Sequence, residues 1–270
     1  MSSTEIICIA SHKGGVGKTT SAATLGSLLS SSGKRTLLVD LDAQRNLTST
    51  FLGARKKPQR TLYEAFCECK DIPIFNVREN LDIVPSSLDL GALDTVIASR
   101  IQRESILARL LNPVKEMYDY IILDCPSQMG IITVNAFTAA NSLVVPISCD
   151  AYAAEGLLQL LDMSEIVRSG LNPNLKLTGI AITRFHTRRT LDQMVETDLR
   201  NRYGDVVFVT RIRENATIVQ APIMSLDIVS YAPKSNGAVD YAALCDELTA
   251  RLKGANGNEN NCTNDNTLCR

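Results

Sequence analysis

A glycine-rich loop stands between an apolar run and a helical segment near the start of the chain. Residues 12–20 read His-Lys-Gly-Gly-Val-Gly-Lys-Thr-Thr and follow the apolar residues 5–10. Glycines let consecutive backbone N–H groups turn inward around a phosphate, and the next helix adds its N-terminal partial charge. The order strand, loop, helix therefore predicts a phosphate-binding loop in which Lys18 contacts the terminal phosphates and Thr19 ligates magnesium.

The rest of the chain alternates short β-branched apolar runs with longer stretches of helical period. This pattern predicts an α/β fold with a mostly parallel, twisted sheet and helices on both faces. The expected strands are 5–10, 35–40, 81–84, 120–124, 142–147 and 177–183, with late strands at 206–209 and 228–230. The expected helices are 18–32, 97–117, 154–169, 190–203 and 240–253.

Nothing in the sequence divides the chain, and residues 1–253 are expected to form a single domain. Residues 254–270 differ, since six of these seventeen are Asn and few are apolar, so we expect a disordered polar tail. No run approaches the length of a membrane span and no signal segment is recognised, which predicts a cytoplasmic protein. Eight cysteines lack zinc or redox spacing, and four of them in apolar stretches are expected to be reduced core residues: Cys8, Cys125, Cys149 and Cys245.

The loop departs from the general phosphate-loop pattern at two neighbouring positions. His12 stands at the first glycine position, and Lys13 adds a second lysine. Lys13-Gly-Gly-Val-Gly-Lys18-Thr resembles the deviant Walker A motif of the MinD and ParA group of ATPases. The resemblance implies a P-loop NTPase fold and a dimer that encloses two ATP molecules, with Lys13 contacting the partner's nucleotide. The ATP-binding residues so implied are Lys13, Gly14, Gly15, Val16, Gly17, Lys18, Thr19 and Thr20.

Acidic residues follow two of the expected strands. Asp40 and Asp42 are two positions apart, so both side chains point the same way at the sheet's carboxyl edge. The segment resembles the family's Asp-x-Asp-x-Gln, which implies that Asp42 orients or deprotonates the attacking water and that Asp40 lies near magnesium; either could instead cap the following turn. Asp124 ends an apolar strand in the Walker B manner and is expected to hold Mg²⁺, with a plain strand-end acid as the alternative. The resemblance thus implies Lys13, Lys18 and Asp42 as catalytic residues and Thr19, Asp42 and Asp124 around Mg²⁺.

Downstream segments are similar to those of small ParA/Soj-type partition ATPases. Residues 155–157, Glu-Gly-Leu, and 234–241, Lys-Ser-Asn-Gly-Ala-x-x-Tyr, carry this similarity, which extends from about residue 6 to 253. It implies adenine-side contacts from Thr183, Arg184 and Asn215. Arg213 and Glu214 replace the usual Pro and Arg, and Thr217 stands where relatives often have a DNA-binding arginine.

A local excess of arginine lies between residues 184 and 213. Seven arginines and four acids give this segment a charge of +3 (7 − 4), in a chain whose net charge is −1. The arginines are Arg184, Arg188, Arg189, Arg200, Arg202, Arg211 and Arg213. A solvated charged face and a non-specific DNA-binding patch fit this composition equally well, and the resemblance favours DNA, with Arg188, Arg189, Arg211 and Arg213 as the contacts.

The family resemblance implies an ATP-dependent, dimerising ATPase that binds double-stranded DNA non-specifically in its ATP state and associates with the nucleoid. With a ParB-like partner that stimulates hydrolysis, it would partition plasmids or chromosomes. The alternatives are a MinD-like membrane ATPase, an iron–sulfur reductase relative, and an orphan ParA-type ATPase or scaffold that positions another cargo. The last helix carries Asp240, Asp246 and Glu247 on its polar side, which is unlike the basic amphipathic helix expected of the membrane type.

Overall fold

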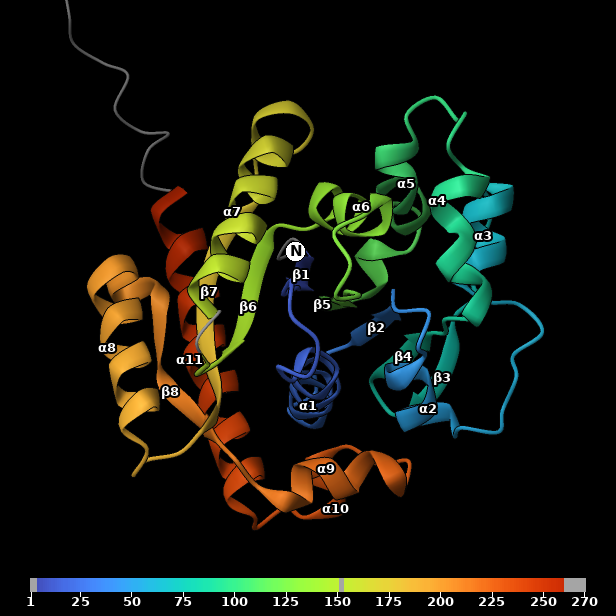
Figure 1. Ribbon diagram of the computed structural model, residues 1–270. Coiled ribbons are helices and arrows are strands. Elements are labelled where there is room, and N and C mark those ends of the chain that lie inside the picture. The colour runs from blue at the N-terminus through green and yellow to red at the C-terminus, as the bar shows by residue number, and fades with distance from the viewer. Residues whose placement is uncertain (1–3, 151–152, 260–270) are drawn as a thin grey trace, which may run out of the picture.

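The computed structural model describes residues 4–150 and 153–259, and a twisted eight-stranded sheet runs through it (Figure 1). The strand order is β3-β4-β2-β5-β1-β6-β7-β8, and every neighbouring pair is parallel except β3 with β4. The strands are β1 (Glu5–Ile9), β2 (Thr36–Asp40), β3 (Phe75–Arg78), β4 (Leu81–Val84), β5 (Tyr120–Asp124), β6 (Ser142–Ser148), β7 (Lys176–Phe185) and β8 (Val207–Arg213). The predicted α/β fold with a mostly parallel sheet is confirmed.

Helices fill the connections between the strands. The α-helices are α1 (Lys18–Ser31), α2 (Asn46–Leu52), α3 (Leu62–Glu68), α4 (Leu93–Val96), α5 (Ile106–Leu111), α6 (Ile131–Ala139), α7 (Ala153–Gly170), α8 (Thr190–Tyr203), α9 (Ala216–Ile223), α10 (Ile228–Tyr231) and α11 (Asn236–Glu259). Short 3₁₀ turns are η1 (Leu88–Ala92), η2 (Arg103–Ser105), η3 (Lys115–Met117) and η4 (Gly204–Val206). No helix in the described ranges combines the length and apolar character needed to cross a bilayer.

Alternating side chains of the central strands enter two separate cores. Ile6 and Cys8 of β1 pack with residues of α3 to α8, whereas Ile7 and Ile9 pack with α1, α2, α9, α10 and α11. Figure 1 shows the two helical layers on opposite sides of the sheet. Because both faces are covered, β5 and β6 are buried almost throughout, as their continuous apolar sequence predicts. Cys8, Cys125, Cys149 and Cys245 are buried and unpaired by disulfides, which confirms them as core residues.

Two predicted elements are wrong. Residues 228–230 form helix α10 rather than a strand, because the Asp227 carboxylate accepts hydrogen bonds from the backbone N–H groups of Val229 and Ser230 at 3.0 Å each and caps a helical turn. The single helix expected over 97–117 is broken into η2, α5 and η3, with Pro113 following the end of α5.

Several boundaries and elements differ from the sequence prediction. Helix α11 begins at Asn236 and ends at Glu259, which takes it six residues past 253, where the polar tail is expected to begin. The remainder of that tail, residues 260–270, lies outside the described residues. The sequence prediction also omitted one strand and five α-helices: β3, α2, α3, α4, α6 and α9.

Candidate active site

The phosphate-binding loop connects the carboxyl end of β1 to the first turn of α1. Gly15 and Gly17 have φ angles of 74° and 89°, a backbone region that a side chain disfavours, and Gly17 is the N-cap residue of α1. The N-terminal end of α1 therefore lies at the carboxyl edge of the sheet, beside the ends of β5 and β6, which flank β1. This placement confirms the strand, loop and helix context that the sequence predicts.

The Lys18 side chain lies inside the loop. Its ammonium group donates to the backbone oxygen of Lys13 at 2.9 Å and to the hydroxyl of Ser127 at 2.7 Å, and the residue is 6% exposed. Burial lowers the pKa of Lys18, and the negative charge of Asp124 opposes this shift. Ser127, which follows β5, therefore connects the phosphate loop to the segment after the Walker B strand.

Lys13 does not share this interior position. Its ammonium group pairs with the carboxylate of Asp150 at 2.6 Å, and the two side chains are 45% and 33% exposed. A second hydrogen bond, from the Ser148 hydroxyl to the other Asp150 oxygen at 2.6 Å, fixes this carboxylate at the end of β6. No motif or spacing in the sequence indicates that Asp150 is the partner of Lys13 within one chain.

The turn after β2 presents Asp42 to the pocket while Asp40 holds the turn in place. Asp40 is fully buried and accepts hydrogen bonds from the Thr48 backbone N–H at 2.7 Å, the Thr48 hydroxyl at 2.6 Å and the Asp42 N–H at 3.1 Å. Burial raises the pKa of Asp40 to about 6 in spite of these bonds. The backbone oxygen of Asp42 accepts from the Ser86 hydroxyl at 2.7 Å. Both aspartates cap the turn, since the Asp42 carboxylate accepts from the Gln44 N–H at 2.9 Å. Of the two, Asp42 is the one that lines the pocket.

Asp124 is completely buried below the phosphate loop. Neither of its carboxylate oxygens has a hydrogen-bond partner among the described residues. Burial and the charge of Asp40 raise the pKa of Asp124 well above its usual range. The Thr19 hydroxyl is near enough to oppose this rise, although it forms no hydrogen bond with the carboxylate. A buried carboxylate without donors is costly unless a cation or ordered water meets it.

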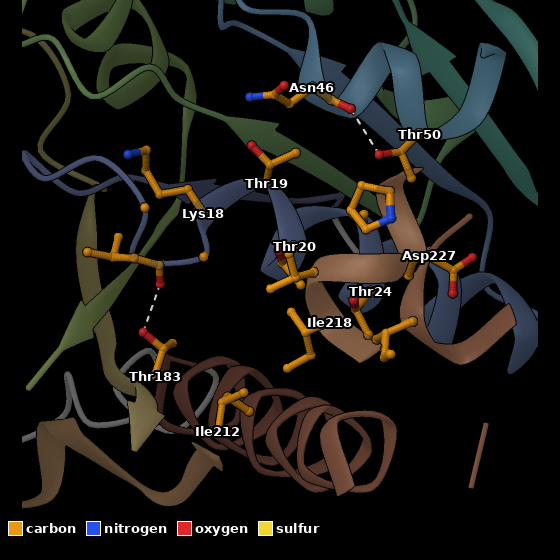
Figure 2. Close-up of a pocket in the computed structure, with 18 of the residues that line it drawn as sticks. Lys18, Thr19, Thr20, Thr24, Asn46, Thr50, Thr183, Ile212, Ile218 and Asp227 are labelled. Atoms are coloured by element: carbon orange, nitrogen blue, oxygen red, sulfur yellow. Dashed lines mark hydrogen bonds between the residues drawn. The ribbon is translucent and has the colours of Figure 1, made fainter. Parts of the chain in front are cut away.

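These residues border a pocket of about 670 Å³ between the phosphate loop and α9. Figure 2 shows Lys18, Thr19 and Thr20 at the pocket, with Ile212 and Ile218 on the side away from Lys18. Ten predicted ATP or phosphate contacts line it: Gly14, Gly15, Val16, Gly17, Lys18, Thr19, Thr20, Thr183, Arg184 and Asn215. Lys13 is not among the lining residues.

Two of the adenine-side residues also have structural roles. The Thr183 hydroxyl donates to the backbone oxygens of Val16 at 2.8 Å and Ile147 at 3.1 Å, so it fixes the phosphate loop to β6 and β7. The Asn215 side-chain oxygen accepts from the Thr217 N–H at 3.0 Å and caps α9.

The apolar wall of the pocket was not predicted. It consists of Ile212, Ile218, Val219, Pro222 and Leu226 and comes from β8, α9 and the following turn. The run 216–223 contains apolar residues at helical spacing behind an Asn cap, which is a signal that could have identified α9. A polar, glycine-lined end and an apolar end suit a nucleotide, with phosphates and base respectively.

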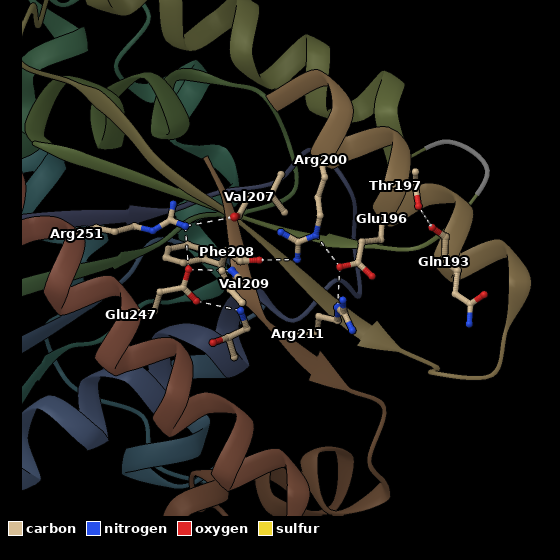
Figure 3. Close-up of polar contacts among 11 residues, drawn as sticks. Gln193, Glu196, Thr197, Arg200, Val207, Phe208, Val209, Arg211, Glu247 and Arg251 are labelled. Carbon is tan, nitrogen blue, oxygen red and sulfur yellow. Dashed lines mark hydrogen bonds and ion pairs between the residues drawn. The ribbon is translucent and has the colours of Figure 1, made fainter. Parts of the chain in front are cut away.

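The arginines of the predicted basic patch are mostly paired with acids. Figure 3 shows two of them, Arg200 and Arg211, beside Glu196. Arg200 and Arg211 both contact Glu196, at 2.8 and 2.7 Å, and Arg213 binds Asp240 through two nitrogens. Three further ion pairs are Arg184 with Glu214 at 3.2 Å, Arg189 with Asp192 at 3.6 Å and Arg202 with Asp198 at 2.9 Å. Of the seven arginines, Arg188 is the one without an ion pair to the described part of the chain. The local charge of +3 is therefore largely compensated within this surface.

Known proteins share this arrangement over most of the chain. A family model described as an AAA domain matches residues 4–177. The chain is 39% identical over 249 residues to the sporulation initiation inhibitor protein Soj of Bacillus subtilis, covering 91% of this chain and 98% of Soj. It is 38% identical over 251 residues to the chromosome partitioning protein ParA of Myxococcus xanthus, covering 91% of this chain and 88% of that protein.

A solved structure resembles the fold and holds a nucleotide with a metal. Cobyrinic acid a,c-diamide synthase of Mycobacterium smegmatis, with bound ATP analog and magnesium, aligns at a TM-score of 0.82 and 30% identity, covering 93% of this chain and 97% of that chain. ATP and Mg²⁺ fit the present site, because Asp124 offers a buried carboxylate without hydrogen-bond donors and Thr19 lies in the first turn of α1. No three His, Cys, Asp or Glu side chains converge as a metal cluster in the described ranges.

Proposed function

Since the chain belongs to the ParA/Soj family of partition ATPases, we propose that it hydrolyses ATP to ADP and phosphate and acts in plasmid or chromosome segregation. The observation that carries this proposal is the joint placement of Lys18 in the phosphate loop and Asp42 at the same pocket. Phosphoryl transfer needs positioned charge more than covalent chemistry, and these groups supply it.

The residues at the phosphate end neutralise charge, hold the metal and position the attacking water in this proposal. The backbone N–H groups of Gly14 to Gly17 and the Lys18 ammonium group neutralise the phosphates. Thr19, Asp42 and Asp124 would hold Mg²⁺ directly or through water, and the ion would neutralise charge on the β- and γ-phosphate oxygens. Asp42 orients the attacking water and accepts its proton as oxygen bonds to the γ-phosphorus and the bond to ADP breaks.

We place Lys13 at the contact between two subunits. Its ammonium group lies outside the pocket of its own chain and is partly exposed, so it is available to a nucleotide held by a second copy. Exchange of the Asp150 carboxylate for a phosphate keeps the lysine paired with an anion. The expected ATP-bound form is a homodimer with two enclosed nucleotides.

We further propose that the protein binds double-stranded DNA non-specifically in the ATP state and releases it after hydrolysis. A dimer presents two weak phosphate-binding surfaces at once, which raises affinity without new contacts in either subunit. Among the arginines suggested by the sequence, unpaired Arg188 is the best placed to contribute, whereas Arg189, Arg211 and Arg213 would have to exchange acidic partners for phosphates. A ParB-like protein is the expected stimulator of hydrolysis, and the ATP-bound dimer is expected on the nucleoid.

Steady-state ATP turnover of matched aspartate variants tests the enzymatic part. Asp42→Ala should bind ATP and lose at least about 100-fold in turnover, within the usual range for a group that positions or accepts a proton. Asp71→Ala removes an exposed aspartate remote from the pocket lining and should turn over like wild type. Equal turnover by Asp42→Ala and wild type would contradict the role given to Asp42.

A further inference from the structure

The connection between α2 and α3 is strongly basic. Residues 43–63 contain five basic side chains and no acidic one, in a chain with a net charge of −1. The five are Arg45, Arg55, Lys56, Lys57 and Arg60. Four of them lie within the loop 53–60, which extends away from the sheet beyond α2 at the right of Figure 1.

Three of these charges are free to meet a partner. Arg55, Lys56 and Lys57 are exposed, and none of their side chains forms an ion pair within the described residues, while Arg60 pairs with Glu68 at 2.9 Å. The contrast is with residues 184–213, where six of seven arginines have acidic partners. An uncompensated cluster attracts a polyanion without first having to break internal pairs.

The loop is attached directly to the turn that lines the nucleotide pocket. The Arg45 guanidinium donates from Nη2 to the backbone oxygen of Lys56 at 2.9 Å, and the Arg45 N–H donates to the Asp42 oxygen at 2.9 Å. Arg45 has a φ of 59°, and its buried Nε has no hydrogen-bond partner among the described residues. Arg45 therefore links the Asp42 turn to the loop.

We propose that Arg55, Lys56 and Lys57 bind phosphates of the DNA backbone. This inference rests on the proposed function and assigns its DNA contact to the loop between α2 and α3. Adjacent cations on an exposed loop without aromatic neighbours suit sequence-independent phosphate contacts. A protein partner is disfavoured because residues 43–63 include none of the large exposed hydrophobic side chains that anchor protein interfaces.

The test compares two triple variants with the same loss of charge. Arg55→Gln/Lys56→Gln/Lys57→Gln removes the loop cluster, and Lys34→Gln/Lys115→Gln/Lys253→Gln removes three lysines scattered over other elements. Binding of each full-length protein with ATP to a duplex of random sequence is measured across a salt series. The loop variant should bind at least about tenfold more weakly at low salt, and its log K against log[salt] slope should be shallower by about 2 to 3. The scattered variant should stay within about twofold of wild type, and ATP turnover without DNA should be unchanged in both.

Each other outcome has a distinct meaning. If wild type binds DNA with ATP and the loop variant matches it in affinity and slope, the loop inference is wrong and the proposed function stands. If the loop variant binds DNA normally and loses only stimulation by a partner protein, the loop is a protein contact and the inference is again wrong. If wild type itself binds no DNA in any nucleotide state, the DNA part of the proposed function fails.

Discussion

The Lys13 ammonium group lies 2.6 Å from a carboxylate oxygen of Asp150 in its own chain. The residue that the family resemblance assigns to the partner's nucleotide is thus paired internally in the single chain. Because both side chains are partly exposed, the pair contributes little to folding and can be exchanged at small cost.

Lys13→Ala should leave folding almost unchanged and prevent dimer formation. The expected change in unfolding free energy is below about 1 kcal/mol, in line with exposed ion pairs. Light scattering after size-exclusion chromatography should show a monomer with a non-hydrolysable ATP analog, where wild type forms a dimer. Lys34→Ala, at an exposed site remote from the pocket, serves as control and should dimerise. Normal dimerisation of Lys13→Ala would contradict the interface role.

Thr48→Val should destabilise the protein through the buried Asp40 carboxylate. The substitution keeps the shape but removes the hydroxyl that donates to Asp40 at 2.6 Å and accepts from the Ser86 N–H at 2.9 Å. The expected cost in urea unfolding is about 1–3 kcal/mol, as for a buried polar group left without a partner. Thr50→Val in the same helix removes only a bond to the Asn46 backbone oxygen and should cost less; equal costs would contradict the special role of Asp40.

Glu247 covers the outer edge of β8 and should contribute stability that depends on pH. It accepts hydrogen bonds from the Val209 N–H at 2.8 Å and the Thr210 N–H at 3.0 Å (Figure 3). Burial alone would raise the pKa of Glu247, but these bonds and the one from Arg251 outweigh it and lower the pKa.

A lowered folded-state pKa means that this stabilisation is present above the unfolded value of about 4.3 and disappears as the pH falls through the folded value. Glu247→Gln should therefore be about 1–2 kcal/mol less stable than wild type at pH 7, with the gap closing as the pH falls below the unfolded value. Glu116→Gln, at an exposed position, is the control. A gap that is independent of pH would contradict the argument.

Gly179→Ala should be strongly destabilising, because an added Cβ would overlap the ring of Phe208. That ring is fully buried and carries the Arg251 guanidinium at 4.1 Å from its centre, so it has little room to move. We expect a loss of about 2–3 kcal/mol by thermal unfolding. At Gly170 an added Cβ meets nothing within 4 Å, and Gly170→Ala should be neutral. Similar melting temperatures for the two variants would contradict this packing argument.

Much of the fold follows from local sequence, since strands buried on both faces have continuous apolar runs. Residues 120–124 and 81–84 match β5 and β4 to the residue. Ile228 and Val229 resemble a strand by composition, but the Asp227 cap makes them helical, which a short window of β-branched residues conceals. The breaks within 97–117 depend on Pro113 and on packing against α6, so apolar periodicity alone predicted too long a helix.

Some residues of the site can likewise be predicted from the sequence, and others cannot. The phosphate-loop residues are predictable because consecutive positions carry the chemistry. The Lys13–Asp150 pair joins the loop to the end of β6, and the wall residue Ile218 comes from α9, so both depend on tertiary contacts that the spacing does not contain. Arg211 and Arg213 have the residue type expected for DNA, but their acidic partners Glu196 and Asp240 lie 15 and 27 residues away and meet them through tertiary contacts.

DNA binding as a function of nucleotide state tests the central claim most directly. Affinity for a random-sequence duplex should be measured with ATP, with ADP and without nucleotide, for wild type, Lys18→Ala and Asp42→Ala. We predict that wild type binds only with ATP, that Lys18→Ala fails to bind because it cannot hold the nucleotide, and that Asp42→Ala binds and stays bound after wild type has been released. Binding that is the same in all three nucleotide states would contradict an ATP-dependent switch.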